Sequence, residues 1–141
     1  MINAYASYKR QSVTTMTPIE IIVKLYDECD RQLNRALHFI EKKDYESTNA
    51  ALMKSVDVVS ALRSVLDLDI QMGVDLDKLY LYFTQELIDA NIKKDAEKIR
   101  TLLPMIGDLR EAFVQVSRMS VEQINLQAMQ NAQGTMQAQV V

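Results

Sequence analysis

The chain has 141 residues, 48% hydrophobic and 25% charged, which is typical of one globular domain and too apolar for a disordered chain. Three glycines and two prolines are too few for the many turns of an all-β fold, so we expect a few long helices. The net charge of −3, with both signs interleaved along the chain, argues against nucleic-acid binding.

The single cysteine, Cys29, excludes an internal disulfide framework and a multi-thiolate zinc site. The first residues lack the basic and apolar regions of a secretory signal, and no apolar run is long enough to cross a bilayer. We therefore expect a cytoplasmic protein that does not insert into membranes.

Residues 1–16 show no sustained helical period. They contain Tyr5 and Tyr8, and we interpret them as an N-terminal arm or cap that packs onto the domain.

The first helix is predicted to begin at Pro18, because Thr17 suits the N-cap and Glu20 completes a capping box. It runs to about Lys42. Its apolar residues recur at steps of three and four and form one stripe: Ile19, Ile22, Tyr26, Cys29, Leu33, Ala36 and Ile40.

Asp44 is a suitable N-cap for a second helix. That helix has two adjacent stripes, one of Leu52, Val56, Val59, Leu62 and Leu66, the other of Ala51, Val58, Ala61 and Val65. Residues 67–73 break the pattern and predict a loop, after which Asp75 is expected to cap a third helix. The stripe of the third helix consists of Leu76, Leu79 or Tyr80, Phe83, Leu87 and Ala90.

A fourth helix is predicted to open at Asp95, with a stripe of Ile99, Leu102, Ile106, Leu109, Phe113 and Val116. Pro104 falls inside this stripe, and because the stripe is regular on both sides of it we expect a kinked but continuous helix. Residues 121–141 form a Gln-rich tail with no charge after Glu122. We expect a short extra helix there, followed by a disordered end from Gly134.

Four helices joined by short loops predict an all-α fold, an antiparallel up-down-up-down four-helix bundle over residues 17–120, with the arm before it and the tail after it.

The sequence gives little support for an enzyme, a metal site or a cofactor. The only histidine, His38, has Arg35 three residues before it, so the Glu-x-x-His pairs of a di-iron bundle are missing. The glycines stand alone and form no phosphate-binding loop. A histidine phosphotransfer domain using His38 is an alternative, but Glu41 stands where such domains usually have a lysine, and a carboxylate there would repel the phosphoryl group.

Several helices carry apolar residues outside their core stripe. Part of this surplus broadens the core, and the rest predicts grooves for an amphipathic segment of another chain. The groove candidates are Ile21, Leu25, Met53, Val58, Val65, Leu81 and Ile88.

Several motifs, in order, resemble those of the flagellin export chaperones, the FliS family. Residues 18–27 (PIEIIVKLYD) resemble the opening helix of that family, and residues 79–82 (LYLY), followed by Leu87, the Ala90–Asn91 pair and Asp95, resemble its third helix. Leu66–Asp67 and residues 109–113 (LREAF) also agree, although Phe113 stands where a tryptophan is common. The resemblance covers about residues 4–118.

This resemblance implies a cytoplasmic, non-enzymatic chaperone that binds the disordered C-terminal segment of flagellin. Such a protein prevents premature polymerisation and delivers flagellin to the flagellar type III export apparatus. Partners implied with it are a component of the export gate and flagellar regulatory proteins. In this picture Tyr5 and Tyr8 shield an apolar groove until flagellin arrives. A self-associating structural bundle is a further alternative, and the oligomeric state stays open.

Overall fold

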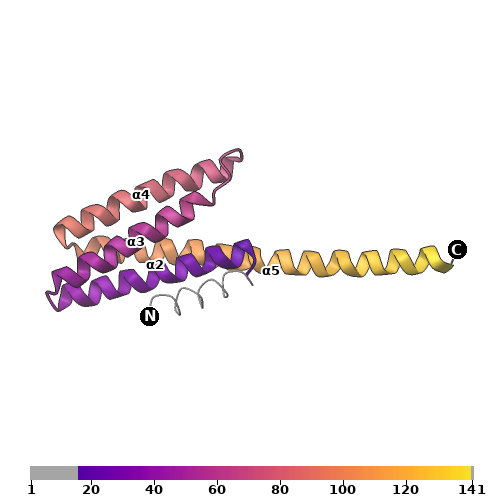
Figure 1. Ribbon diagram of the computed structural model, residues 1–141, viewed down its shortest axis with the longest axis horizontal. Coiled ribbons are helices and arrows are strands. Elements are labelled where there is room, and N and C mark those ends of the chain that lie inside the picture. The colour runs from indigo at the N-terminus through magenta and orange to yellow at the C-terminus, as the bar shows by residue number, and fades with distance from the viewer. Residues whose placement is uncertain (1–15, 141) are drawn as a thin grey trace, which may run out of the picture.

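The computed structural model describes residues 16–140, except for the side chains of 120–122, 124 and 134–140. Within this part the chain forms four helices and no strand: α2 (Pro18–Glu41), α3 (Tyr45–Ser64), α4 (Gln71–Lys93) and α5 (Ala96–Val140). Consecutive helices run in opposite directions (Figure 1). Each packs against the next, and α5 also packs against α2. The predicted antiparallel up-down-up-down bundle is therefore confirmed.

Three helices begin where their capping residues predict. The Glu20 main-chain N–H donates to Thr17 Oγ1 (3.2 Å), and that of Ser47 donates to Asp44 Oδ1 (3.1 Å). The Lys98 N–H likewise donates to Asp95 Oδ1 (3.2 Å). Each bond satisfies a donor that the first helical turn leaves without an intrahelical partner.

The start of α4 differs from the prediction. The helix begins at Gln71, so Asp75 lies inside it and is not its cap. Gly73 is buried in the first turn, where an added Cβ would lie 1.9 Å from the Asp67 carbonyl oxygen. This glycine therefore allows a helix to pass close to the preceding connection, whereas the sequence pattern suggested a loop.

The core lies between the four helices and follows the predicted stripes closely. Its buried apolar residues are Tyr26, Cys29, Leu33, Ala36, Ala51, Leu52, Val59, Leu62, Tyr80, Phe83, Leu87, Ala90, Ile99, Leu102 and Ile106. Val116, the last residue of the predicted α5 stripe, is an exception, because it is 45% exposed.

Helix α5 is continuous across Pro104 and onward to Val140. The extra helix expected after residue 121 is thus an extension of α5, and the backbone from Gly134 to Val140 is helical where we predicted disorder. Glutamine, alanine and methionine are good helix formers, and one glycine costs only about 1 kcal/mol of helix stability.

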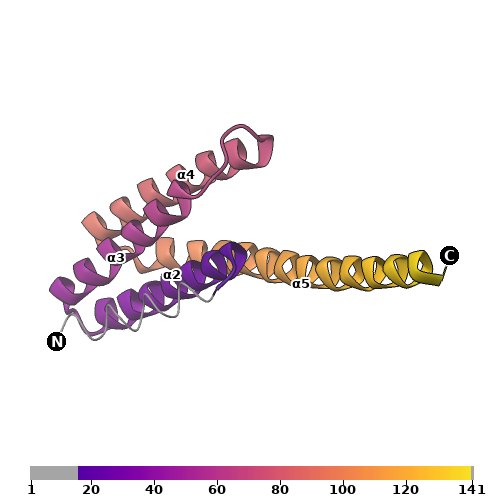
Figure 2. The ribbon, with the colours of Figure 1, turned by 45° about the vertical axis from the view of Figure 1, so that its right-hand side comes forward.

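The hairpin of α3 and α4 diverges from α2 and α5 towards its 65–70 connection, as two views show (Figures 1 and 2). The bundle is therefore closed at the end with the other two connections and open at this one. The divergence decides where apolar side chains remain uncovered.

Candidate functional site

The described residues include no group of three or more His, Cys, Asp or Glu side chains placed to hold a metal ion. Burial raises the pKa of the Cys29 thiol to about 12, with smaller contributions from Asp30 and Glu28. Because the thiolate is the reactive form, Cys29 is an inert core residue.

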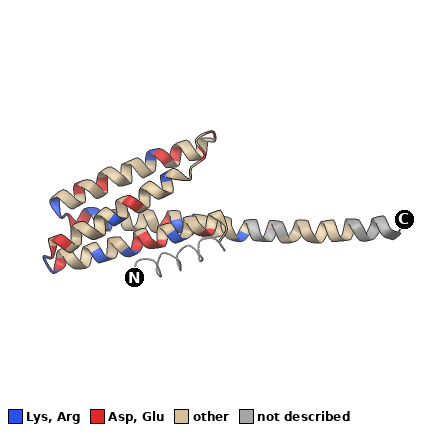
Figure 3. Ribbon diagram, in the orientation of Figure 1, with Lys and Arg blue, Asp and Glu red and all other residues tan. Residues whose placement is uncertain are grey.

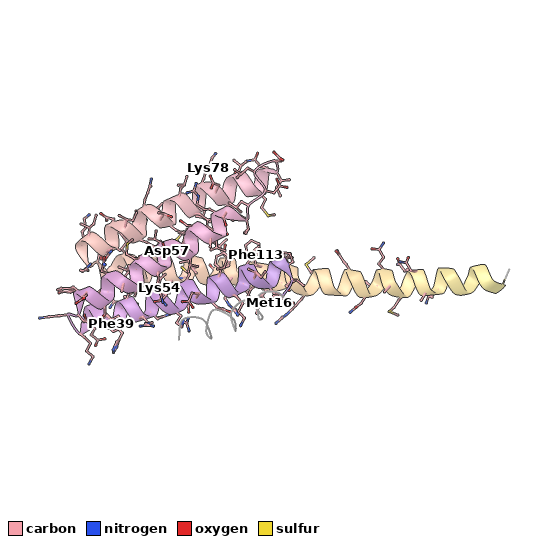
Figure 4. All side chains as sticks on the ribbon, viewed as in Figure 1. Met16, Phe39, Lys54, Asp57, Lys78 and Phe113 are labelled. Carbon is pink, nitrogen blue, oxygen red and sulfur yellow. The ribbon has the colours of Figure 1, made fainter. Side chains whose placement is uncertain are left out.

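An apolar pocket of about 220 Å³ opens where the α3–α4 hairpin diverges from α2 and α5. We call it the open-end pocket. Ile22 of α2 and Phe113 of α5 (labelled in Figure 4) form one side of it. The hairpin supplies the rest: Leu62, Val65, Leu66, Asp67, Ile70, Met72, Gly73, Leu76 and Tyr80.

The connection beside this pocket carries large apolar side chains that face solvent. Val65, Leu68, Ile70 and Met72 are each between 52% and 65% exposed. Single exposed apolar residues are normal, but a group of four within eight positions indicates a contact surface. Sequence reasoning missed Leu68, Ile70 and Met72, because it treated the segment only as a loop. The close spacing of large apolar residues in this short segment could have predicted an exposed apolar surface.

The inner wall of the open-end pocket is aromatic. Tyr26 stacks on Phe113, with ring centroids 5.6 Å apart, and its hydroxyl is hydrogen-bonded to that of Tyr80. Burial raises the pKa of both tyrosines, and their mutual bond adds to the rise at Tyr26 while partly offsetting it at Tyr80. Both hydroxyls are therefore protonated at neutral pH.

A second apolar surface lies on the outer side of the α3–α4 pair. The Asn91 amide donates to Asn49 Oδ1 (2.7 Å), and Arg63 Nε donates to Asp77 Oδ1 (2.8 Å). These two bonds set the register of the pair and bring Met53 level with residues 87 and 88. We define the α3–α4 outer face as Met53, Leu81, Ile88 and Ile92, which are 38–77% exposed.

The remaining groove candidates lie on the other side of α3, towards α2. Val58 is five residues, or about 140° of helical rotation, from Met53. We define the α2–α3 seam as Ile21, Leu25, Val58 and Val65. Leu25 and Val58 are half-buried and pack against the core, and Ile21 is also half-buried, whereas Val65 is exposed. By helical rotation, Met53 and Val58 therefore lie on different sides of α3.

A further groove of about 270 Å³ lies between the first turns of α2 and residues 114–118 of α5. It is lined in part by Met16, the first described residue, which Figure 4 labels beside α5. Tyr5 and Tyr8, which the sequence assigns to an arm that covers a groove, lie outside the described residues.

Charged residues of both signs are distributed over the outer faces of the bundle (Figure 3). Among the described residues, four interhelical ion pairs join α2 to α5 (Asp27 with Arg110), α3 to α4 (Asp77 with Arg63) and α4 to α5 (Glu86 and Asp89, each with Lys98). No single-sign patch dominates the described surface, so the apolar surfaces are its distinguishing feature.

Comparison with known proteins identifies the family. A family profile described as "Flagellar protein FliS" matches residues 1–120. This chain belongs to the FliS family.

Two curated relatives agree with this assignment. The flagellar secretion chaperone FliS of Bacillus subtilis is 31% identical over 113 residues, which is 80% of this chain and 85% of the relative. The flagellar secretion chaperone FliS of Salmonella typhimurium is 30% identical over 120 residues, or 82% and 89% of the two chains.

A solved structure supports the fold. A bacterial flagellar chaperone, known from a crystal structure, matches with a TM-score of 0.68 over 83% of this chain and 97% of its own. Its sequence identity of 16% means that this likeness concerns the fold alone.

FliS proteins are chaperones and not enzymes, so the family assignment argues against the phosphotransfer alternative. His38 is an exposed residue on α2. Among the described residues no helix is both long and apolar enough to cross a membrane.

Proposed function

We propose that this FliS protein binds the disordered C-terminal segment of flagellin in the cytoplasm. It keeps newly made flagellin from polymerising and delivers it to the flagellar type III export apparatus, where a component of the export gate receives the complex. The observation that supports this proposal best is the apolar surface left outside the core, in the open-end pocket and on the α3–α4 outer face.

The location of this surface suits a long, flexible client. The open-end pocket, the α3–α4 outer face and the α2–α3 seam all border the same hairpin, so one extended segment can contact them in succession. An unfolded client loses conformational entropy when it binds, and a large apolar contact area offsets that loss. Binding of this kind needs no nucleotide and no catalytic group.

A titration tests the proposal. A peptide of the flagellin C-terminal segment, added to the chain in a calorimeter, is expected to bind with micromolar or tighter affinity and a negative heat-capacity change, because apolar surface is buried. Absence of heat at millimolar peptide concentration would contradict the proposal.

A substitution localises the binding surface. Leu81→Asp places a charge on the α3–α4 outer face, and we expect it to weaken peptide binding more than about fivefold while the helical circular-dichroism signal stays intact. Leu81 suits this test better than Val58, because Val58 packs against the core and its replacement by aspartate threatens folding.

The matched control is Ala112→Asp, which adds the same charge at an exposed position of α5. It is expected to leave the affinity unchanged. Equal losses in the two variants would mean that net charge, and not the α3–α4 outer face, governs binding.

A further inference from the structure

Tyr80, which lines the open-end pocket, forms a hydroxyl pair with Tyr26 behind it, and this pair has one more proton than its mutual hydrogen bond uses. The hydroxyls of Tyr26 and Tyr80 are hydrogen-bonded to each other, and each residue is only 1% exposed. Among the described residues neither hydroxyl has another hydrogen-bond partner. Each hydroxyl carries one proton, and only one of the two protons can lie between the oxygens. Within the described part of the chain, the pair therefore keeps one O–H group without an acceptor.

The surroundings indicate which hydroxyl keeps the free proton. Tyr80 lines the open-end pocket, whereas Tyr26 is covered by Phe113 and does not line it. If Tyr26 donates its proton to Tyr80, the Tyr80 proton is the one without an acceptor among the described residues. Since a hydroxyl that accepts a hydrogen bond becomes a stronger donor, this arrangement also strengthens Tyr80 towards a third group.

The pocket otherwise favours apolar groups. Most of its lining consists of aliphatic and aromatic side chains, and its volume of about 220 Å³ fits one or two client side chains. Asp67 is the one acidic residue among the described residues of the lining, and its negative charge disfavours a carboxylate as the acceptor. A main-chain carbonyl is a neutral acceptor, and an unfolded segment that places an apolar side chain in the pocket brings its own carbonyl groups with it.

We propose that the Tyr80 hydroxyl is the polar contact of the open-end pocket and donates a hydrogen bond to a main-chain carbonyl of the bound client segment. This inference rests on the proposed function and adds a positioning role to it. The apolar lining supplies contact area, and the hydroxyl fixes which residue of the client sits in the pocket, because a buried donor is satisfied only when a carbonyl lies opposite it.

Two isosteric variants test the inference. Tyr26→Phe and Tyr80→Phe remove the same interhelical hydrogen bond, so similar losses of stability are expected in urea unfolding. Only Tyr80→Phe removes the donor that lines the pocket. We expect it to weaken binding of the flagellin C-terminal peptide about fivefold to tenfold, the effect of one hydrogen bond, and Tyr26→Phe to weaken it less than about twofold.

The control is Tyr82→Phe, on the same helix but 42% exposed and outside the pocket lining, which should bind like the wild type. Equal affinities of the Tyr26 and Tyr80 variants would overturn the inference while the proposed function stands. Absence of peptide binding by the wild-type chain would instead overturn the proposed function and this inference with it.

A measurement on the wild-type chain covers the case in which a variant fails to fold. In protein labelled with 13C-tyrosine, the signal of the Tyr80 ζ-carbon, which carries the hydroxyl, is expected to shift when the peptide binds. The Tyr82 signal serves as reference. A Tyr80 signal that does not move at saturating peptide would also overturn the inference.

Discussion

Gly73 and Gly107 are both helical glycines, but their surroundings are opposite. A Cβ on Gly73 would collide with the Asp67 carbonyl, whereas a Cβ on Gly107 would meet no described atom within 4 Å beyond its chain neighbours and the nearby backbone of its own helix. The first glycine is required by packing, and the second only weakens its helix. The close approach at Gly73 also fixes the connection that borders the open-end pocket.

We therefore predict that Gly73→Ala lowers the free energy of unfolding by about 1–3 kcal/mol, since overpacking outweighs the better helix propensity of alanine. Gly107→Ala is expected to raise it by about 0.5–1 kcal/mol. Urea unfolding of both variants measures the two effects. A destabilising Gly107→Ala, or a neutral Gly73→Ala, would contradict this description of the two sites.

At the scale of the helices, capping residues decide where each helix begins. Asp44 caps α3, and hydrogen bonds from the side chain and main chain of Ser47 hold the pKa of its carboxyl below the ordinary range. A lowered pKa means that the folded state favours the ionised carboxylate. Its contribution to stability is therefore complete above the unfolded pKa of about 3.9 and is lost as the pH falls through the lower folded value.

Asp44→Ala should accordingly lower the urea midpoint at pH 7, where the carboxylate caps α3 in the wild type. The difference between the two proteins should shrink as the pH falls below about 3.9. Unfolding curves at a series of pH values between neutral and acid check this. A difference that stays constant down to the lowest pH at which both proteins fold would show that ionisation of Asp44 does not matter.

At the scale of the whole molecule, the chain consists of a bundle and a helical extension. The family profile ends at residue 120, and Figure 1 shows α5 continuing beyond the bundle from about that point. The described side chains between residues 123 and 133 are all exposed. The apolar surfaces on which the proposed client binding rests belong entirely to the bundle.

Deletion of residues 121–141 is therefore expected to change the free energy of unfolding of the bundle by less than about 0.5 kcal/mol, as for other exposed changes. The affinity for the flagellin peptide should also stay the same. Urea unfolding and calorimetry of the shortened chain measure both quantities. A marked loss of affinity would place part of the binding surface on the extension.

Much of this description follows from local sequence pattern. Steps of three and four placed the core residues of all four helices, and Thr17, Asp44 and Asp95 marked helix starts because a cap bonds only to the next turn. The pattern failed at α4, where Gly73 was interpreted as part of a loop. Its actual role is to let the helix pass close to the Asp67 carbonyl. The helical period of a sequence cannot predict such a contact, because the contact joins the helix to the connection before it.

The sequence by itself determined the helices, their antiparallel order and the presence of more apolar residues than one core stripe needs. Only the tertiary structure decided that Leu81 and Val65 belong to different surfaces, and that Phe113 meets Ile22 and Tyr80 around one pocket. The physical reason is that periodicity specifies which residues share a face of one helix, while the tilt between helices depends on how side chains distant in the sequence pack together.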